Sequence, residues 1–423
     1  MNPVEQSIHE IGARARAASR ELAKLSSAQK STCLLAMADG LVAGTDKLLR
    51  ANADDLARAE KSGLTKAAID RLRLTPERIA GMAAGIREVA GLADPVGEIL
   101  REWTRPNGMK ISKIRTPIGV VGIIYESRPN VTSDAAVLCL KTGNAVILRG
   151  GSEAISSNLA ISNALQAGGA EAGLPGGSVQ IVPTTDREAV RIMAQMDEFM
   201  DVIIPRGGHS LIENVVSHAR MPVIKHYHGV CHVYVDKGAD LDMAREIAIN
   251  AKCQRPGVCN AMETLLVHRD VAAAFFENAA PAFQKFPVEM RADPEAFRLL
   301  ASLGYGPLGE ADENSWRTEY LEMILSVRVV GSLDEAVAHM EKYGSHHSDA
   351  IVTGDPSAAE KFLREVDSAT VYWNASTRFT DGGEFGFGAE IGISTDKLHA
   401  RGPMGLEELT SYKYLIRGTG QIR

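Results

Sequence analysis

The sequence predicts an α/β protein with two doubly wound parallel-sheet domains. Three observations indicate this class. The chain has 423 residues, enough for roughly two to three domains at ~100–200 residues each. Helical patterns fill its first hundred residues. After Pro117, short continuous apolar runs alternate with helical stretches, a rhythm typical of buried parallel strands linked by helices.

The N-terminal region is predicted to be helical, because leucine and methionine recur there at helical spacings. Residues 71–76, RLRLTP, indicate the end of one helix and the start of another at Pro76. Asn107-Gly108 then lies between two potential strands. This pair predicts a β-hairpin over residues 102–111.

The following chain predicts two sheets. Strands of the first are expected at 119–125, 145–149, 178–182, 202–205 and 223–225, with helices at 131–140, 155–167 and 187–196. The second unit begins with a strand at 230–235 and a helix at 243–251. It continues with strands at 263–267, 324–330, 350–352 and 371–374, and the chain ends in a strand at 409–416.

Composition excludes several functional classes. Acidic residues outnumber basic ones, 53 to 46, so a broad basic face for nucleic acid is not expected. No apolar run approaches the ~18–20 residues of a membrane span, and the polar N-terminus does not read as a signal peptide. Five scattered cysteines are not a disulfide framework. A cytoplasmic location follows as an expectation.

Two glycine pairs follow predicted strands and could bind a phosphate. Neither a P-loop nor a G-x-G-x-x-G pattern occurs. The sequences RGGSE (149–153) and PRGGH (205–209) are nevertheless strand–turn–helix junctions, where backbone amides can receive an anion. Tight connections without a ligand explain the same glycines, so both interpretations stay open.

Cys259 is the candidate nucleophile among the thiols. It lies in QRPGVCN (254–260), between a predicted helix and a predicted strand, which places the side chain in a cleft. Arg255 would favour the thiolate, the form that attacks carbonyls. The alternative is a small apolar filler. Cys253, at a helix end, is the competing thiol.

Histidines in HYHGVCH (226–232) raise a metal hypothesis. His226 and His228 would share one face of an extended segment, and His232 could complete a zinc set. No carboxylate lies in this stretch, so structural or substrate-contacting histidines are the preferred interpretation. His346-His347 is interpreted as a solvated loop.

Several motifs resemble the aldehyde dehydrogenase superfamily over nearly the whole chain. They are TPIGVVG (116–122), GNAVILR (143–149) followed by Ser152-Glu153, GLP (173–175) and the highly specific QRPGVCNAME (254–263). The motifs YESRPN (125–130), KHYHG (225–229) and NASTRF (374–379) resemble the branch that reduces an acyl phosphate. The resemblance implies an aldehyde dehydrogenase-like fold with a small bridging or oligomerisation β element.

The resemblance also implies site residues. Cys259 matches the nucleophile, and Asn130 is the candidate for the oxyanion asparagine. Glu322 matches the glutamate that holds the nicotinamide ribose. Arg149 stands where many relatives have lysine, and its fixed charge suits the 2′-phosphate of NADPH/NADP. The other expected cofactor contacts are Gly150, Ser152, Pro205, Arg206, Gly207 and Gly208. The expected substrate contacts are Arg128, His226, Arg255, Ser376, Thr377 and Arg378.

The implied reaction is reduction of L-glutamyl 5-phosphate by NADPH to L-glutamate 5-semialdehyde and phosphate, through a Cys259 thioester, in proline biosynthesis. His226 replaces the glutamate that activates water in oxidising relatives. Two alternatives remain. One is another thiol-dependent acyl reductase of the superfamily, for example of acyl-CoA, and the other is a zinc hydrolase using His226, His228 and His232.

The implied domains are a cofactor-binding domain (1–99 and 113–229), a catalytic domain (230–385) and a bridging element (100–112 and 386–423). That element implies a homodimer or a higher homo-oligomer. The expected partner is a small-molecule substrate, with neither nucleic acid nor membrane. Association with glutamate 5-kinase, which forms the substrate, is a further hypothesis.

Overall fold

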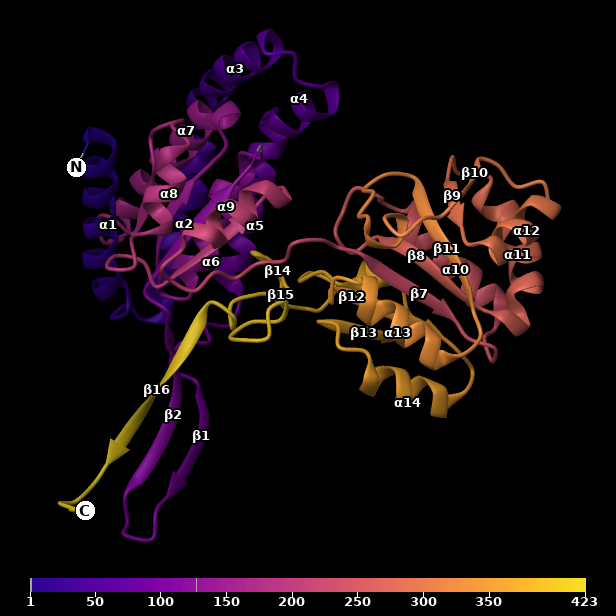
Figure 1. Cartoon of the computed structure of the whole chain (residues 1–423). Helices are drawn as coiled ribbons and strands as arrows, with labels where there is room; N and C mark the ends of the chain where they lie inside the picture. Colours follow the sequence, from indigo (N-terminus) through magenta and orange to yellow (C-terminus); the bar gives the residue numbers. More distant parts are fainter. Residues whose placement is uncertain (1, 127) are drawn as a thin grey trace. The chain divides into compact units, whose positions relative to one another are not determined.

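The computed structural model describes residues 2–126 and 128–423, which form two compact units (Figure 1). Unit 1 comprises the chain up to Lys225 together with Gly386–Gly392 and Met404–Arg423. Unit 2 comprises His226–Phe385 and Ile393–Pro403.

The N-terminal region of unit 1 is helical, as predicted. Its helices are α1 (Pro3–Leu22), α2 (Ser27–Ala43), α3 (Thr45–Lys61), α4 (Lys66–Leu72) and α5 (Pro76–Gly91). The Thr75 hydroxyl caps α5 by accepting the N–H of Arg78, and Pro76 occupies the first turn, where no backbone donor is needed. The predicted helix restart at Pro76 is therefore confirmed.

Unit 1 contains a four-stranded parallel sheet in the order β5-β4-β3-β6. The strands are β3 (Val120–Tyr125), β4 (Ala145–Arg149), β5 (Val179–Ile181) and β6 (Val202–Arg206). The connecting helices are α6 (Asn130–Lys141), η1 (Ser152–Ala154), α7 (Ile155–Glu171), α8 (Glu188–Ala194) and α9 (His209–His218).

The prediction of a strand at 223–225 is wrong. Val223 makes one isolated bridge to Ile203 in β6, and unit 1 ends at Lys225 before a ladder can form.

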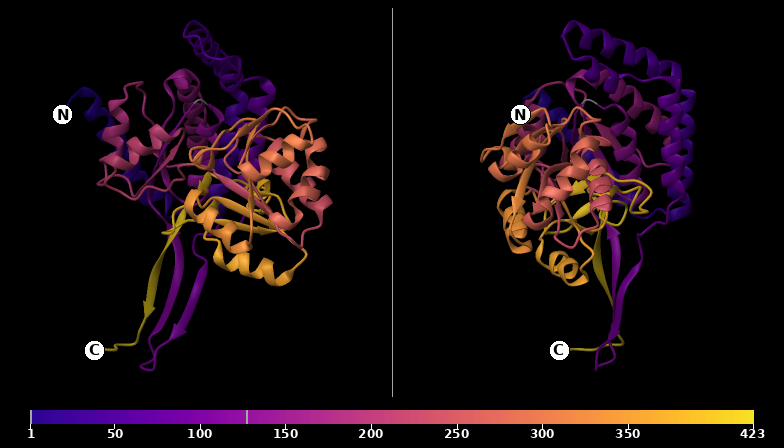
Figure 2. Two further views of the ribbon diagram at one scale, coloured as in Figure 1. Left: turned by 45° about the vertical axis from the view of Figure 1, so that its right-hand side comes forward. Right: turned by 90° about the vertical axis from the view of Figure 1, so that its right-hand side faces the viewer.

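The predicted hairpin is confirmed and belongs to a three-stranded antiparallel sheet. β1 (Ile99–Thr104) pairs with β2 (Lys110–Pro117), and β2 also pairs with β16 (Thr410–Arg417). Gly108 has φ +86°, a value that glycine adopts without steric cost. The sheet projects from the rest of unit 1 in every view (Figures 1 and 2).

Unit 2 is built on a seven-stranded parallel sheet in the order β10-β9-β11-β8-β7-β12-β13. The strands are β7 (Cys231–Val235), β8 (Met262–His268), β9 (Glu289–Ala292), β10 (Leu308–Glu310), β11 (Ile324–Val330), β12 (Ser348–Val352) and β13 (Thr370–Trp373). The helices are α10 (Leu241–Cys253), α11 (Arg269–Phe283), α12 (Pro294–Ser302), η2 (Ser315–Arg317), α13 (Leu333–Tyr343), α14 (Pro356–Glu365) and η3 (Thr377–Phe379). Short strands β14 (Gly392–Ser394) and β15 (Gly402–Met404) form a separate pair.

Helices cover both faces of this sheet, as the doubly wound prediction requires. Val233 and Val235 of β7 join a core with residues of α10 and α11. Tyr234, between them, joins a second core with residues of α13 and α14. Successive side chains of a strand point to opposite faces, so each buried strand supplies both cores. Within the part of the chain that the structure describes, no helix is long and apolar enough to cross a membrane.

Candidate active site

Cys259 lies in the loop that joins α10 to β8, as predicted. The Asp240 carboxylate begins α10 by accepting the N–H of Met243, and the helix ends at Cys253. All five cysteines lie among the described residues, and Cys259 is the one that is not buried. Burial raises the pKa of Cys253 to about 11, which makes this competing thiol a poor source of thiolate at neutral pH.

The backbone of Cys259 packs directly against Gly229. A Cβ on Gly229 would lie 1.9 Å from the carbonyl oxygen of Cys259 and 2.6 Å from its Cα. The buried Cys231 thiol donates to the same carbonyl oxygen at 3.2 Å. Sequence reasoning did not identify Gly229 as a site residue. The available signals were its place in the KHYHG motif and before a predicted strand. Neither shows that two backbones approach closely, which is a tertiary property.

Arg378 is held beside the Cys259 loop by side chains of that loop. Its Nε donates to Gln254 Oε1 at 2.8 Å, and a terminal guanidinium nitrogen donates to Asn260 Oδ1. Burial, followed by the like charge of Arg255, lowers the pKa of Arg378. The structure therefore gathers two predicted substrate-binding arginines at the nucleophile loop.

Ser376 and Thr377 are buried and support this arrangement. Ser376 Oγ accepts the backbone N–H of Arg378 at 3.3 Å, and Thr377 Oγ1 donates to the carbonyl of Asn260 at 2.8 Å. Both hydroxyls have partners within the protein. Their predicted contact with substrate stays a prediction.

His347 is fully buried, so the prediction of a solvated loop at this residue is wrong. Its Nδ1 lies 2.8 Å from Ser348 Oγ, and burial lowers its pKa to about 3. Its ring meets that of His226 edge to face, with centroids 5.7 Å apart. The chain enters β12 at Ser348, inside the sheet, and the sequence alone did not separate this position from a surface turn.

The three histidines of the zinc hypothesis have different surroundings. His232 is fully buried in β7, with Nδ1 2.7 Å from Asp349 Oδ1. His228 Nδ1 lies 3.6 Å from Glu319 Oε2. Among residues 2–126 and 128–423, no group of three His, Cys, Asp or Glu side chains could hold a metal ion. Nothing in the described geometry favours the zinc hydrolase.

Glu322 is exposed in the loop that precedes β11. The residue before it, Leu321, has φ +56°, and its N–H donates to Glu263 Oε1 at 3.1 Å. The carbonyl oxygen of Leu321 would lie 3.6 Å from a Cβ on Gly257. The loop that carries Glu322 therefore adjoins the loop that carries Cys259.

In unit 1, the predicted cofactor residues follow two strands that flank β3. Arg149 ends β4 and is 8% exposed, with Gly150 and Ser152 directly after it. The Arg149 guanidinium donates to the carbonyl of Gly150 at 3.1 Å and, more weakly, to those of Thr185 and Asp186 at 3.4 and 3.5 Å. Its buried Nε has no hydrogen-bond partner in the structure.

Pro205 and Arg206 end β6, and Gly207 and Gly208 form the turn before α9. Glu126 Oε2 accepts the N–H of Gly208 at 3.0 Å. A carboxylate thus occupies the anion position at this helix N-terminus. The N–H of Gly208 is thus bound by a protein carboxylate in the structure, whereas a cofactor phosphate was expected there. Gly207 and Gly208 also form the short connection between β6 and α9.

Arg128 and Asn130 also belong to unit 1. Arg128 is exposed before α6, and Asn130 is the first residue of that helix. Asn130 Nδ2 donates to Asp134 Oδ2 at 2.8 Å. Cys259 lies in unit 2, so the oxyanion role of Asn130 stays a prediction.

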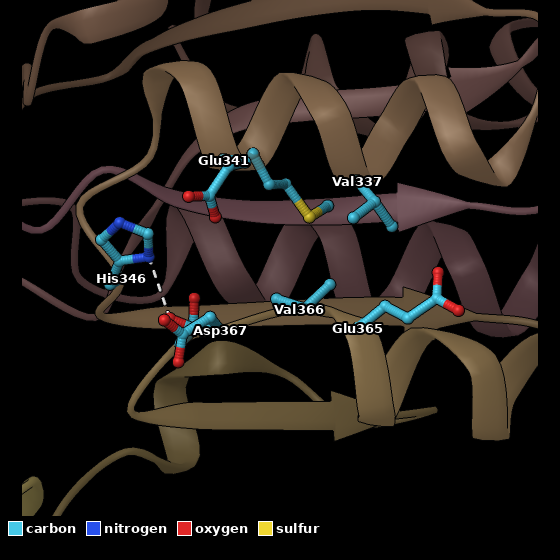
Figure 3. Close-up of a pocket in the computed structure, with 8 residues that line it drawn as sticks. Val337, Glu341, His346, Glu365, Val366 and Asp367 are labelled. Carbon is cyan, nitrogen blue, oxygen red and sulfur yellow. Dashed lines mark hydrogen bonds between the residues drawn. The ribbon is translucent and has the colours of Figure 1, made fainter. Parts of the chain in front are cut away.

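A pocket in unit 2 lies between α13 and the segment that follows α14 (Figure 3). Its lining includes Glu341, Glu365 and Asp367, and His346 Nδ1 lies 2.9 Å from the Asp367 carbonyl oxygen. Lys397 and Arg401 hold the pKa of Asp367 at about 2. None of the predicted site residues lines this pocket.

Comparison with known proteins identifies the class. The model of the aldehyde dehydrogenase family matches residues 4–298, and the chain belongs to that family. A relative named gamma-glutamyl phosphate reductase, from Moorella thermoacetica, is 55% identical over 97% of this chain and 97% of its own. The protein of the same name from Geotalea daltonii is 55% identical over 99% of both chains.

Solved structures agree with this assignment. The crystal structure of gamma-glutamyl phosphate reductase from Thermotoga maritima matches with TM-score 0.95 and 43% identity, covering 98% of this chain and 99% of that one. An acetylating aldehyde dehydrogenase from Geobacillus thermoglucosidasius, at 17% identity and TM-score 0.71, shares the fold. The predicted aldehyde dehydrogenase-like fold is confirmed.

Proposed function

We propose that this chain reduces L-glutamyl 5-phosphate to L-glutamate 5-semialdehyde and phosphate with NADPH, as a step of proline biosynthesis. The observation that carries the proposal is the Cys259 loop, which combines the partly exposed thiol with Arg255 and with Arg378, two arginines suited to an anionic substrate. The printed name of the relatives that match along nearly the whole chain supplies the substrate.

The first chemical step is attack of the Cys259 thiolate on the acyl carbon of the substrate. The backbone N–H of Cys259 donates to the developing oxyanion, with Asn130 as the proposed second donor. Phosphate then leaves with the electrons of the C–O bond, and a thioester remains on Cys259. Arg255 and Arg378 attract the phosphate and the carboxylate, so the substrate is oriented before attack.

Arg149 and Glu322 are the residues that the proposal assigns to the nicotinamide cofactor. Aldehyde dehydrogenase family enzymes use nicotinamide cofactors. The buried Nε–H of Arg149 makes no hydrogen bond in the structure, and two contacts of its guanidinium are long, at 3.4 and 3.5 Å. These donors could bind the 2′-phosphate of NADPH, which NADH lacks, so Arg149 favours NADPH. Glu322 offers an exposed carboxylate to ribose hydroxyls. NADPH, when bound, would supply a hydride to the thioester carbonyl; the C–S bond would then break, which releases the semialdehyde and restores the Cys259 thiolate.

His226 replaces a water-activating carboxylate in this proposal. The His226 ring lies edge to face with that of His347, and no glutamate carboxylate stands at this position to activate water, so the thioester survives until reduction.

We assign cofactor binding to unit 1 and catalysis to unit 2. A cytoplasmic homodimer or higher homo-oligomer forms through the sheet of β1, β2 and β16, where Tyr412, Tyr414 and Ile416 are exposed apolar side chains. Association with glutamate 5-kinase would deliver the labile acyl phosphate directly.

The test follows NADPH absorbance with freshly generated glutamyl phosphate, using the wild type and two matched thiol variants. Cys259→Ser should bind NADPH and lose turnover, because an unactivated hydroxyl is a poor nucleophile. Cys253→Ser should keep most activity. The opposite result for the two variants would contradict the proposed nucleophile. Acyl-CoA substrates in the same assay test the alternative, and their preferential reduction would replace the proposed substrate.

A further inference from the structure

An ion pair is buried beneath the Cys259 loop and is not used by the proposed mechanism. Lys252, in the last turn of α10, places its Nζ 2.6 Å from Oε2 of Glu263, near the start of β8. Both side chains are almost fully buried, with 0% and 1% of their surfaces exposed. The two residues stand at opposite ends of the loop, so the pair ties the end of the helix to the start of the strand.

The second oxygen of Glu263 reaches a different segment. β8 and β11 are neighbours, with Thr264 opposite Ser326, and this pairing brings Glu263 to the loop before β11. There, Glu263 Oε1 accepts the N–H of Leu321 at 3.1 Å. Leu321 adopts a left-handed φ of +56°, which costs free energy for a residue other than glycine and persists only where surrounding contacts hold it.

Lys252 also lies near this segment. Its Nζ lies 6.0 Å from the ring centroid of Tyr320, the residue before Leu321. The Tyr320 hydroxyl is fixed in turn, 2.9 Å from Ser326 Oγ in β11. The two charged groups thus join three segments: the end of α10, the start of β8 and residues 320–321.

A buried pair of this kind is a costly way to gain stability, because both charges lose their hydration. Hydrophobic side chains of similar volume would fill the space at lower cost. What apolar side chains do not supply is a hydrogen-bond acceptor for the Leu321 N–H.

We propose that Lys252 and Glu263 are positioning residues: Glu263 fixes the backbone of Leu321, so that Glu322 faces the nicotinamide ribose, and Lys252 keeps Glu263 in place. This inference rests on the proposed function for the role of Glu322. It assigns neither residue a contact with substrate or cofactor.

The test compares two double variants that both remove the buried charges. Lys252→Met with Glu263→Gln keeps a carbonyl oxygen for the Leu321 N–H, whereas Lys252→Met with Glu263→Met removes it at similar volume. We expect the glutamine variant to bind NADPH within about 3-fold of the wild type. We expect the methionine variant to bind about 10–100-fold more weakly, the scale on which loss of a hydrogen bond to a charged group lowers affinity. A purely structural pair would change the melting temperature and leave NADPH affinity equal in the two variants, which would overturn the proposal.

A further double variant tests the proposal if the Lys252→Met, Glu263→Met protein does not fold. Lys252→Arg with Glu263→Asp keeps an ion pair but withdraws the carboxylate from Leu321, so the same loss of NADPH affinity is expected. Unchanged affinity would overturn the proposal. The rate at which iodoacetamide alkylates Cys259 should stay within about 3-fold in every variant, because the pair acts on the neighbouring loop.

The wild type separates this inference from the proposed function. Absence of turnover with glutamyl phosphate, together with intact NADPH binding, would reject the proposed substrate and leave the comparison of variants meaningful. A wild type that binds no nicotinamide nucleotide would overturn the positioning role itself.

Discussion

Gly229→Ala is expected to disable the nucleophile without touching any functional side chain. The added methyl would meet the Cys259 carbonyl oxygen at 1.9 Å and its carbonyl carbon and Cα at 2.6 Å. Ordinary van der Waals contact begins at 3.4 Å, so one backbone must move by about 1.5 Å. All three contacted atoms belong to the backbone, and no side-chain rotation can relieve the overlap.

The expected cost has two parts. Overpacking a dense interior costs about 1–3 kcal/mol, which corresponds to a decrease in Tm of about 2–12 °C for a unit of this size. Displacement of a reacting group by about 1 Å costs about 100-fold in rate. We therefore expect the variant to fold with reduced stability and its kcat/KM to fall by at least about 100-fold.

Three measurements check this expectation: the Tm, kcat/KM with glutamyl phosphate, and the rate of Cys259 alkylation. Gly309→Ala is the matched control in the same unit, because nothing lies within 4 Å of its added methyl. That control should retain activity and Tm. A Gly229→Ala protein with wild-type kcat/KM and alkylation rate would refute the argument from backbone contact.

Three further predictions follow from groups already described. Arg149→Ala should weaken NADPH by about 1.5–3 kcal/mol, the scale of a charged hydrogen bond, and leave NADH unchanged in titrations; equal losses would assign this arginine another role. With the semialdehyde and NADP⁺, steady-state turnover should require inorganic phosphate as acyl acceptor, and His226→Glu should introduce phosphate-independent turnover; rapid oxidation by the wild type without phosphate would contradict the mechanism. Burial, assisted by His232 and Arg328, lowers the pKa of His339 to about 2, and burial lowers that of His347 to about 3, both below the ordinary ~6.5. The unfolded chain therefore binds protons at these two histidines as the pH falls below about 6.5, whereas the folded chain does not. The free energy of unfolding, measured by denaturant titration, should decrease by about 4 kcal/mol between pH 7.5 and 5, and the decrease should be smaller for His339→Phe.

Local patterns in the sequence determined most of the secondary structure and both sheets. Strands 145–149 and 324–330 coincide with β4 and β11, because each segment is rich in valine, isoleucine and leucine. The Asn107-Gly108 hairpin followed from the turn conformation that this pair prefers. The candidate nucleophile also followed from the sequence, since the helix–loop–strand pattern around Cys259 placed it outside the core.

Sequence patterns did not predict the short, polar strands. β9 (Glu289–Ala292) and β10 (Leu308–Glu310) carry charged residues and are only four and three residues long. Their strand conformation comes from pairing at the edge of the sheet, where β9 pairs with β11 and β10 pairs with β9. Conversely, the apolar run at 223–225 made a single bridge, because the chain leaves the sheet there. Pairing partners, which are distant in sequence, decided these cases.

Tertiary structure alone decided how the site is supported. The sequence presents Gly229 as a glycine before a predicted strand, His347 as part of a solvated loop, and Lys252 and Glu263 as ordinary charges. Folding places the first against the Cys259 backbone, buries the second and pairs the last two beneath the nucleophile. Periodicity reports whether a side chain faces the core, and motifs report which chemistry a residue can perform. Neither reports which distant backbone will approach it, because that contact exists only after separate strands have joined one sheet.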